Sequence, residues 1–438
     1  MRKLVLNVAF FMACTFVFYG CGGGGQQGAV PRNRTFIADC SSQGDCSGQF
    51  KDYDTFNPFL LAGTTKTGWN FVYEPLYFYN AYAEGSDNII PWIATGHEYN
   101  SDYTGVTVSI RKGVEWSDGQ PWTAHDLVFT INMLKDHAPS LSFSTDMKAW
   151  VKNATAVDDH TAQIELTASN PRFIFSYFTN NFDNGIPIMP KHIWEGKDPE
   201  SFSNFDMEQG WPVVSGPYKM AISVPEQRVW DIRPDWWATK VGFRELPKVE
   251  RLIYLPYMEE SKRVQNIIAN AMDTSLDLRP PNIKSIIDAN PGVSTWTGKE
   301  LPLGYLDWWP VCLGFNNLEP PFDDPEVRRA VNHAIDREQL VKIGWQGAGT
   351  SSHLPLPNFP PIRTYTDGIQ DLIDKYEIGV YDPTKTAEIL QRKGWSKDWE
   401  GFWSKSSERL TMVVDIFGIF NDLAPVLVAQ LKQAGVDA

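Results

Sequence analysis

Apolar and polar residues alternate with the period of a β-strand at several places in the middle of the chain. Val106, Val108 and Ile110, for example, are separated by polar residues, which indicates a strand with one buried face. Related patterns predict strands in the segments 105–110, 161–167, 249–258 and 305–317, and two more within 216–237 that are joined at Pro225. The segment 305–317 is mostly apolar, which predicts a buried strand.

A helical period appears directly after the first of these strands. Thr123 is followed three residues later by Asp126, which is a capping box in its acidic variant. Apolar residues then recur on one helical face, namely Leu127, Val128, Ile131 and Leu134. Similar stripes predict helices within 259–273, 320–345, 381–395 and 421–435. Strands and helices follow one another throughout, so we expect an α/β protein with antiparallel elements.

The first residues have the pattern of an export signal. Arg2 and Lys3 precede an apolar run over 4–19, which is short of the ~20 residues that span a bilayer. Gly20 and Cys21 resemble a bacterial lipobox, whose cysteine is acylated after cleavage, and the glycine–glutamine run behind them suits a flexible tether. We expect an exported protein anchored by lipid at the outer side of the cell membrane; the alternative is an ordinary signal peptide with an incidental cysteine.

Composition restricts the remaining chain. Roughly 400 residues without the leader are enough for two or three domains, and the net charge of -14 argues against nucleic acid or an anionic membrane surface as a partner. The charges are interspersed, as on a solvated surface. The 17 tryptophans and 16 tyrosines are numerous and supply rigid contact faces for peptides, sugars or apolar ligands, although many of them must belong to the core.

Three cysteines remain after the lipid-anchored one and the leader are set aside. Cys40 and Cys46 bracket a small polar loop, and outside the cytoplasm we expect them to form a disulfide, with free thiols as the alternative. Cys312 lies in the apolar run "WWPVCLGF", where a buried small hydrophobic residue is expected. Neither the cysteine spacing nor the histidines suggest a zinc site.

No enzyme motif is convincing. The seven histidines are scattered, at positions 97, 125, 137, 160, 192, 333 and 353, and no phosphate-binding glycine loop is present. Ser109 and Lys112 match the S-x-x-K of penicillin-recognising enzymes, and 66–68 match their K-T-G. The two matches stand in the reverse order, however, and Ser109 falls in a predicted strand instead of at a helix start. We therefore expect no enzyme, no cofactor and no metal, with a serine enzyme that uses Ser109 and Lys112 as a remote alternative.

Four motifs together carry a resemblance to a known family. They are "VYEPLYFY" (72–79), "GVTVSIRKGVEWSDGQPWTAHDLVFTI" (105–131), "VSGPYKM" with "RPDWW" (214–220 and 233–237), and "LGFNNLEPPFDDPEVRRAVNHAIDREQLV" (313–341). In this order they resemble the family 5 extracellular solute-binding proteins, the oligopeptide and dipeptide binders of ABC importers. The likeness covers residues 54–438.

The resemblance implies a two-lobed clamp of the periplasmic-binding-protein type II kind with an extra inserted domain. By similarity, the signal peptide is 1–20, the tether 21–35, the first lobe 36–72 and 196–278, the inserted domain 73–195 and the distal lobe 279–438. Family members usually continue well past 438. This agrees with the end of the chain, where Gly435 closes a helix and the strand that should follow is only begun, so we expect an incomplete distal lobe.

The resemblance also implies the function. A monomeric receptor would close on its ligand, and the closed form would be distinguished by the permease subunits in the membrane. Peptides are the expected ligand, with cello-oligosaccharide-like sugars stacked on tryptophans as the alternative. An acidic residue that pairs with a peptide's α-ammonium is expected beyond Ala438.

The candidate ligand-contacting residues are aromatic or lie next to aromatic residues: Trp69, Asn70, Trp211, Trp308 and Trp309. For each of them, packing in the core or at the hinge is the alternative. Trp236 and Trp237 belong to the "RPDWW" motif and are expected to be structural, because this motif recurs in the family whatever the ligand. Arg328 and Arg329 are expected on the polar side of their helix.

Overall fold

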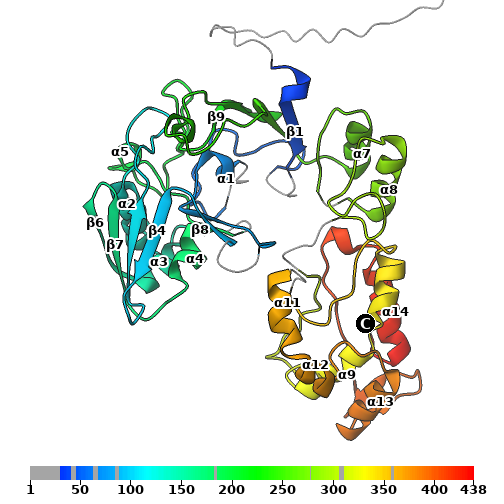
Figure 1. Cartoon of the computed structure of the whole chain (residues 1–438). Coiled ribbons are helices and arrows are strands. Elements are labelled where there is room, and N and C mark those ends of the chain that lie inside the picture. Colours follow the sequence, from blue (N-terminus) through cyan, green and yellow to red (C-terminus); the bar gives the residue numbers. More distant parts are fainter. Residues whose placement is uncertain are drawn as a thin grey trace, which may run out of the picture.

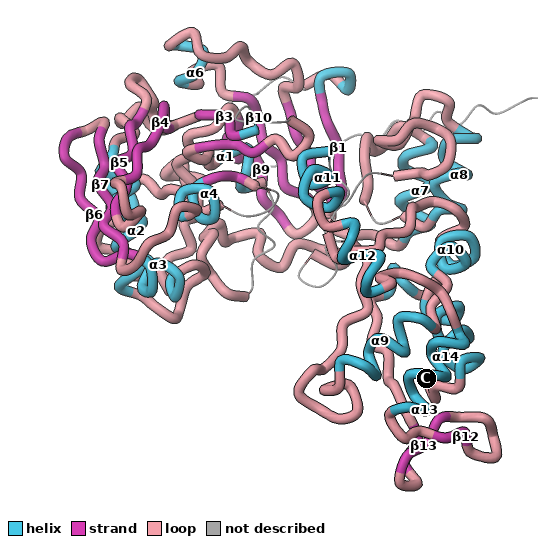
Figure 2. The backbone as a smooth tube through the Cα atoms, turned by 60° about the horizontal axis from the view of Figure 1, so that its bottom comes forward, coloured by secondary structure: helices cyan, strands magenta, loops and turns pink. Residues whose placement is uncertain are grey.

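The chain forms two halves that are built around separate hydrophobic clusters. In the computed structural model the described residues are 30–40, 46–62, 68–83, 88–181, 185–276, 278–304, 310–356 and 360–438. Figure 1 shows a first half that contains nearly all the strands and a second half that is mainly helical, and Figure 2 shows the same division by secondary structure. This is the two-lobed α/β architecture that the resemblance implies.

A four-stranded sheet forms one end of the first half. Its strands are β1 (Thr35–Asp39), β11 (Arg251–Leu255), β10 (Gln227–Ile232) and β9 (Tyr218–Val224), in this spatial order. β1 runs parallel to β11, and the other neighbours are antiparallel. The strand at the edge therefore comes from the beginning of the described chain and pairs with a segment more than 200 residues later. β9, β10 and β11 lie in the segments 216–237 and 249–258, where strands are predicted.

A second, fully antiparallel sheet forms the other end of the first half. Its order is β4 (Ala94–Tyr99), β5 (Gly105–Ile110), β7 (Thr161–Leu166) and β6 (Val151–Asp158). Helix α2 (Ala124–Asp136) packs on β6 and β7. The predicted capping box is present, because the Thr123 hydroxyl accepts the His125 N–H while the Asp126 carboxylate accepts the Thr123 N–H. The predicted strand and helix in this region are thus confirmed.

Short elements connect the two sheets. They are β2 (Tyr77–Tyr79), β3 (Ile89–Pro91), β8 (Thr179–Asn180), α1 (Trp69–Val72), α3 (Ser144–Trp150), α4 (Phe173–Phe178), α5 (Lys191–Trp194) and α6 (Trp237–Lys240), while the 3-10 turn η1 (Arg32–Arg34) precedes β1. A single hydrophobic cluster extends through both sheets and these connections. The segments that the sequence assigns to the first lobe and to the inserted domain thus share one core.

Helices α7 (Glu260–Ile268) and α8 (Pro280–Ala289) form a separate small cluster between the two halves. Val264, Ile267 and Met272 are buried there together with Ile286, and Ile37 of β1 packs against them. The predicted boundary at 278/279 falls between these two helices.

The second half is built on a helical core. Its elements are α9 (Pro325–His333), α10 (Arg337–Gln339), the π-helical turn η3 (Leu340–Gly344), α11 (Pro360–Asp367), α12 (Gln370–Tyr376), α13 (Pro383–Arg392), η4 (Gly418–Phe420), α14 (Ala424–Ala434) and the small sheet of β12 (Ser396–Lys397), β13 (Trp403–Lys405) and β14 (Glu408–Arg409). Asp324 and Asp382 cap α9 and α13, each followed by proline. The predicted apolar stripe of α9 is buried throughout: Val327, Ala330, Val331, Ala334 and Ile335.

One sequence prediction is wrong in this half. The described part of the segment 305–317 contains no strand, since residues 310–317 have no regular structure until a turn begins. Val311 is 59% exposed and Cys312 is exposed as well. Cys312 is therefore not a buried core residue: in the described residues no neighbouring strand pairs with this apolar run and buries it.

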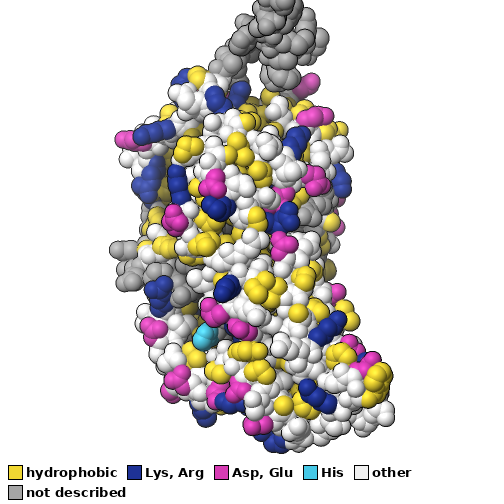
Figure 3. Space-filling model, turned by 90° about the vertical axis from the view of Figure 1, so that its right-hand side faces the viewer, with side chains coloured by type: hydrophobic (Ala, Val, Ile, Leu, Met, Phe, Trp, Pro, Cys, Tyr) yellow, Lys and Arg dark blue, Asp and Glu magenta, His cyan; other side chains and the backbone are white. Residues whose placement is uncertain are grey.

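The predicted disulfide and the interspersed surface charges are confirmed. Cys40 and Cys46 form a disulfide, while Cys21 and the rest of the predicted leader lie outside the described residues. Figure 3 shows acidic and basic side chains mixed over the visible face of the second half. Among the helices of the described ranges, none combines the length and the apolar composition needed to cross a bilayer.

Candidate functional site

Helix α1 carries two of the predicted ligand contacts and is seated on the first sheet. The ring of Phe71 contacts one aromatic residue on each of three neighbouring strands, Tyr218, Trp230 and Tyr254, with centroid distances of 5.9, 5.9 and 6.0 Å. Both Figure 1 and Figure 2 show α1 between the β4–β7 sheet and the half that carries α9 and α14. The short helix is therefore held on the part of the first half that lies toward the second.

Two glycines allow α1 to approach its neighbours closely. Gly68, directly before the helix, has a φ of +91°, and a Cβ there would lie 2.9 Å from the indole of Trp230. Gly216 belongs to the "SGPY" motif, and a Cβ there would lie 2.3 Å from the carbonyl oxygen of Phe71. The N–H groups of Ser215 and Gly216 both donate to the carbonyl of Val72, at 3.0 and 2.8 Å. This motif consequently fixes the end of α1.

A buried carboxylate lies immediately beyond this helix. Glu74 is 3% exposed, and its two oxygens accept the indole N–H groups of Trp92, at 2.9 Å, and of Trp237, at 2.6 Å. Its backbone N–H donates to the hydroxyl of Ser215 at 3.0 Å. Burial raises the pKa of Glu74 from 4.5 to about 7, against the opposing effect of the indole hydrogen bonds and the charge of Arg233.

Arg233 completes this polar cluster. Its guanidinium is buried and donates to the carbonyls of Val214 and Gly216, at 3.1 and 2.9 Å. Its Nε lies 3.6 Å from the carboxylate of Asp235. Two of the four family motifs, 72–79 and the pair 214–220 with 233–237, thus meet around Glu74. Glu74, Ser215 and Arg233 were not predicted as a cluster, because their motifs indicate the family and not which of their residues meet in the fold. Trp236 and Trp237 are buried, which agrees with the structural role expected for them.

The five predicted ligand contacts have different outcomes. Trp69 is half-buried at the start of α1 and packs against the main hydrophobic cluster. Trp211 packs at the margin of the same cluster, with its ring edge-on to Phe202 at 5.5 Å. Asn70 belongs to α1, but its side chain lies outside the described part of the structure, as do Trp308 and Trp309 entirely. Their role in binding stays a prediction.

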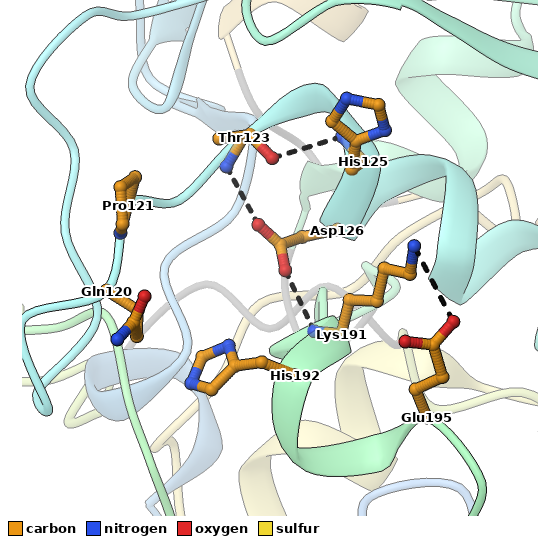
Figure 4. Close-up of a pocket in the computed structure, with 8 residues that line it drawn as sticks. All are labelled: Gln120, Pro121, Thr123, His125, Asp126, Lys191, His192 and Glu195. Atoms are coloured by element: carbon orange, nitrogen blue, oxygen red, sulfur yellow. Dashed lines mark hydrogen bonds and ion pairs between the residues drawn. The ribbon is translucent and has the colours of Figure 1, made fainter.

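A separate pocket of about 240 Å³ lies where α2 and α5 meet (Figure 4). It is lined by Gln120, Pro121, Thr123, His125, Asp126, Lys191, His192 and Glu195, so none of the predicted ligand contacts takes part in it.

Several polar groups of this pocket form hydrogen bonds or ion pairs with other groups of the chain. The two oxygens of Asp126 accept the backbone N–H groups of Thr123 and Lys191, both at 2.8 Å, and burial raises the pKa of this carboxyl. His192 Nε2 lies 2.6 Å from Asp118, and the Lys191 ammonium lies 3.6 Å from Glu195. The bond between Asp126 and the backbone of Lys191 joins α2 to α5. Across the described ranges, His, Cys, Asp and Glu side chains form no group of three or more suited to a metal ion.

The serine-enzyme alternative gains no support from the geometry. Ser109 lies in β5, where it pairs with Thr161 of β7, as the alternating pattern predicts. Ser109 and Lys112 are both exposed. A nucleophile of that class is expected at the start of a helix, and Ser109 is not in such a position.

Comparison with known proteins gives a consistent family. A family model described as "Bacterial extracellular solute-binding proteins, family 5 Middle" matches residues 88–438. The dipeptide-binding protein of Escherichia coli (strain K12) is 24% identical over 375 residues, which are 81% of this chain and 64% of that protein. Heme-binding protein A of Haemophilus influenzae is 26% identical over 342 residues, which are 74% of this chain and 57% of that protein. The chain therefore spans less than two thirds of these two relatives.

Solved structures show the same fold. A periplasmic oligopeptide-binding protein from Thermotoga maritima has a TM-score of 0.73 and 26% identity, over 93% of this chain and 72% of that chain. A structure of the same protein with bound mannohexaose has a TM-score of 0.68 and 25% identity, over the same shares. An oligopeptide-binding protein of Bacillus subtilis, in complex with a nonapeptide, has a TM-score of 0.65 at 19% identity and supports the fold alone.

Replacement of Gly216 by alanine should destabilise the chain. The new methyl group would collide with the Phe71 carbonyl oxygen, which belongs to the backbone and cannot rotate away. Overpacking of this kind costs about 1–3 kcal/mol in the free energy of unfolding, as urea unfolding followed by circular dichroism can measure. Gly96→Ala is the matched control, because a Cβ there meets no atom within 4 Å. Equal stability of the two variants would contradict the close approach.

The buried Glu74 should make stability depend on pH. A carboxyl whose pKa is raised on folding favours the folded state most when the pH is below its unfolded pKa of 4.5, where it is protonated in both states. As the pH rises toward about 7, its contribution to the free energy of unfolding falls, because the unfolded chain can ionise it more easily. The stability of the wild type relative to Glu74→Gln should therefore fall by about 2–3 kcal/mol between about pH 5 and about pH 8.

Urea unfolding of both chains at the two pH values measures this difference. Removal of the exposed carboxylate of Glu226 by Glu226→Gln serves as the control. A relative stability of the Glu74→Gln chain that does not change with pH would show that Glu74 titrates as it does in the unfolded chain.

Proposed function

The chain belongs to the bacterial extracellular solute-binding proteins of family 5, and on this basis we propose that it is the substrate-binding component of an ABC importer. In this role it captures oligopeptides between its two lobes and delivers them, chemically unchanged, to the permease subunits in the membrane. The observation that carries the proposal is the family match over 88–438 in a chain whose fold agrees with a solved oligopeptide-binding protein along nearly its whole length.

Two separate cores suit such a clamp. The cluster of the first half extends through its sheets, whereas that of the second half is formed by α9, α13, α14 and the short strands between them. Each half can therefore move as a unit while its own packing is preserved. A ligand that contacts both halves stabilises the closed state only, and it shifts the population toward that state.

Oligopeptides are the ligand class that the names of the relatives favour. The mannohexaose bound to the Thermotoga maritima protein makes oligosaccharides a specific second candidate, because sugar faces stack on aromatic rings and this chain is rich in tryptophan. The proposed contacts are Trp69 and Asn70 on α1, together with Trp211, Trp308 and Trp309. The contacts on α1 are the best supported of these. This helix is held by the first sheet and by the "SGPY" motif, and it lies between the β4–β7 sheet and the second half (Figure 1).

The proposal also includes the location of the protein, its domain boundaries and its oligomeric state. We place the signal peptide at 1–20, the lipid on Cys21 and the tether between Cys21 and η1. The tether is thus shorter than the expected 21–35, because Arg32–Arg34 form η1 and Thr35 already pairs with Arg251 of β11. The tether would keep the receptor close to its permease and so raise its local concentration. The lobes are taken as 36–72 with 196–278 and as 279–438, with 73–195 as the inserted domain, and the receptor is taken to act as a monomer.

Trp69→Ala should weaken ligand binding by about tenfold or more, because loss of a central tryptophan contact typically costs that much. The measurement is a fluorescence titration of the full chain with mixed tri- to pentapeptides, and in parallel with cello- and manno-oligosaccharides. Trp399→Ala is the matched control, since this indole is 89% exposed in the second half. If only the sugars changed the fluorescence, the ligand would be an oligosaccharide and the peptide proposal would be wrong. Unchanged affinity in Trp69→Ala would remove α1 from the site.

Cys21→Ser should release the protein from the membrane. Without the thiol there is no site for the acyl group, and a single receptor chain then has no stable hydrophobic anchor. Fractionation of cells that express either form should find the wild type with the membranes and the variant outside them. If both forms stay in the same fraction, the lipid-anchor proposal is wrong and an ordinary signal peptide takes its place.

A further inference from the structure

Two arginine side chains lie against one aromatic ring on the surface of the first half. The guanidinium carbon of Arg111 is 3.8 Å from the centroid of Phe243, and that of Arg244 is 4.4 Å from the same centroid. Arg244 also lies 4.9 Å from the ring of Trp92. Arg244 is exposed and Arg111 is half-buried. Two cations thus share one aromatic platform.

The platform is fixed from below. Phe243 stacks on Trp237, with a centroid distance of 5.7 Å and an interplanar angle of 13°, and it meets Trp92 edge-on at 5.2 Å. Both indoles donate to the buried Glu74. The Nε of Arg111 donates to the carbonyl of Trp92 at 2.8 Å, so this guanidinium is also held in place.

The two loops that carry the arginines are docked to each other. Lys240 and Glu115 form an ion pair of 2.5 Å. A Cβ on Gly113, whose φ is +79°, would lie 2.7 Å from the Val241 side chain. The two arginines are therefore positioned by the scaffold, and a ligand would bind without much further ordering.

The charges of this pair are not neutralised inside the described part of the chain. Neither Arg111 nor Arg244 has a carboxylate within 4 Å there, whereas Arg251 forms a two-pronged pair with Asp231 at 2.6 and 2.8 Å. Burial lowers the pKa of Arg111, and the charge of Arg244 lowers it further. Two uncompensated cations at one aromatic ring are unexpected in a chain with a net charge of -14.

We propose that Arg111 and Arg244 together bind a phosphate group. A guanidinium presents a planar fork of donors that matches phosphate oxygens, and a phosphate monoester or inorganic phosphate carries about two negative charges near neutral pH, which equals the charge of the two arginines. A carboxylate has only one. The phosphate is either free in solution or the monoester headgroup of an anionic lipid, as in phosphatidic acid. This site does not depend on the proposed importer function, because none of the proposed ligand contacts belongs to it.

Calorimetric titration of the full chain with inorganic phosphate, against chloride at equal ionic strength, tests the first source. We expect saturable binding that Arg244→Gln weakens by about tenfold or more, as is typical for loss of a charged hydrogen-bond donor. Arg244→Lys should give an intermediate affinity, because it keeps the charge without the fork. Arg172→Gln is the matched control, since Arg172 also lies over a phenylalanine, at 5.0 Å from Phe175, but no other cation of the described residues lies over that ring.

Vesicles of phosphatidylcholine with and without phosphatidic acid test the second source, with Cys21→Ser in every chain so that no acyl group can tether it. Binding that requires phosphatidic acid and is lost in Arg244→Gln identifies a lipid headgroup; saturable binding of free phosphate identifies a soluble ligand. The proposal is wrong if neither probe binds more than chloride or plain phosphatidylcholine does, or if Arg244→Gln and Arg172→Gln bind alike.

Discussion

The carboxylate of Glu74 is the contact on which the architecture of the first half depends. A charged or protonated carboxyl can be buried only if its oxygens find donors, and here two indoles supply them. Each partner comes from a different part of the chain, so the single side chain fixes three segments relative to one another. Ser215 links the same residue to the end of α1. The face that we propose for ligand binding and the platform that carries Arg111 and Arg244 both rest on this cluster.

Local patterns in the sequence were sufficient for most of the elements. α2 and α9 were predictable because their caps and apolar stripes are complete within a few residues, and β5 and β7 because buried and exposed residues alternate along them. The conformation of the segment around Cys312 was not predictable, since an apolar run indicates only that burial would be favourable. Whether burial occurs depends on a second element that covers the run, and sequence period contains no information about that element. Val311 and Cys312 belong to such an apolar run and are nevertheless exposed.

The polar cluster was hidden for a related reason. The donors to Glu74 lie 18 and 163 residues away, and nothing in "VYEPLY" itself distinguishes a buried glutamate from an exposed one. The motifs pointed to a family, and the fold of that family was therefore predictable as a whole. The individual ligand contacts were not, because stacking in a core and stacking on a ligand require the same residue type. Trp69 and Trp211, both half-buried at the margin of one cluster, satisfy either role.

Whether the two halves close on a ligand is most directly measured by small-angle X-ray scattering of the full chain, without ligand and with saturating peptide or oligosaccharide. Closure brings the two hydrophobic cores together, so the radius of gyration should decrease with a bound ligand and return when the ligand is removed. A radius that stays the same with a ligand that demonstrably binds would show that the molecule is a rigid receptor, and it would contradict the clamp.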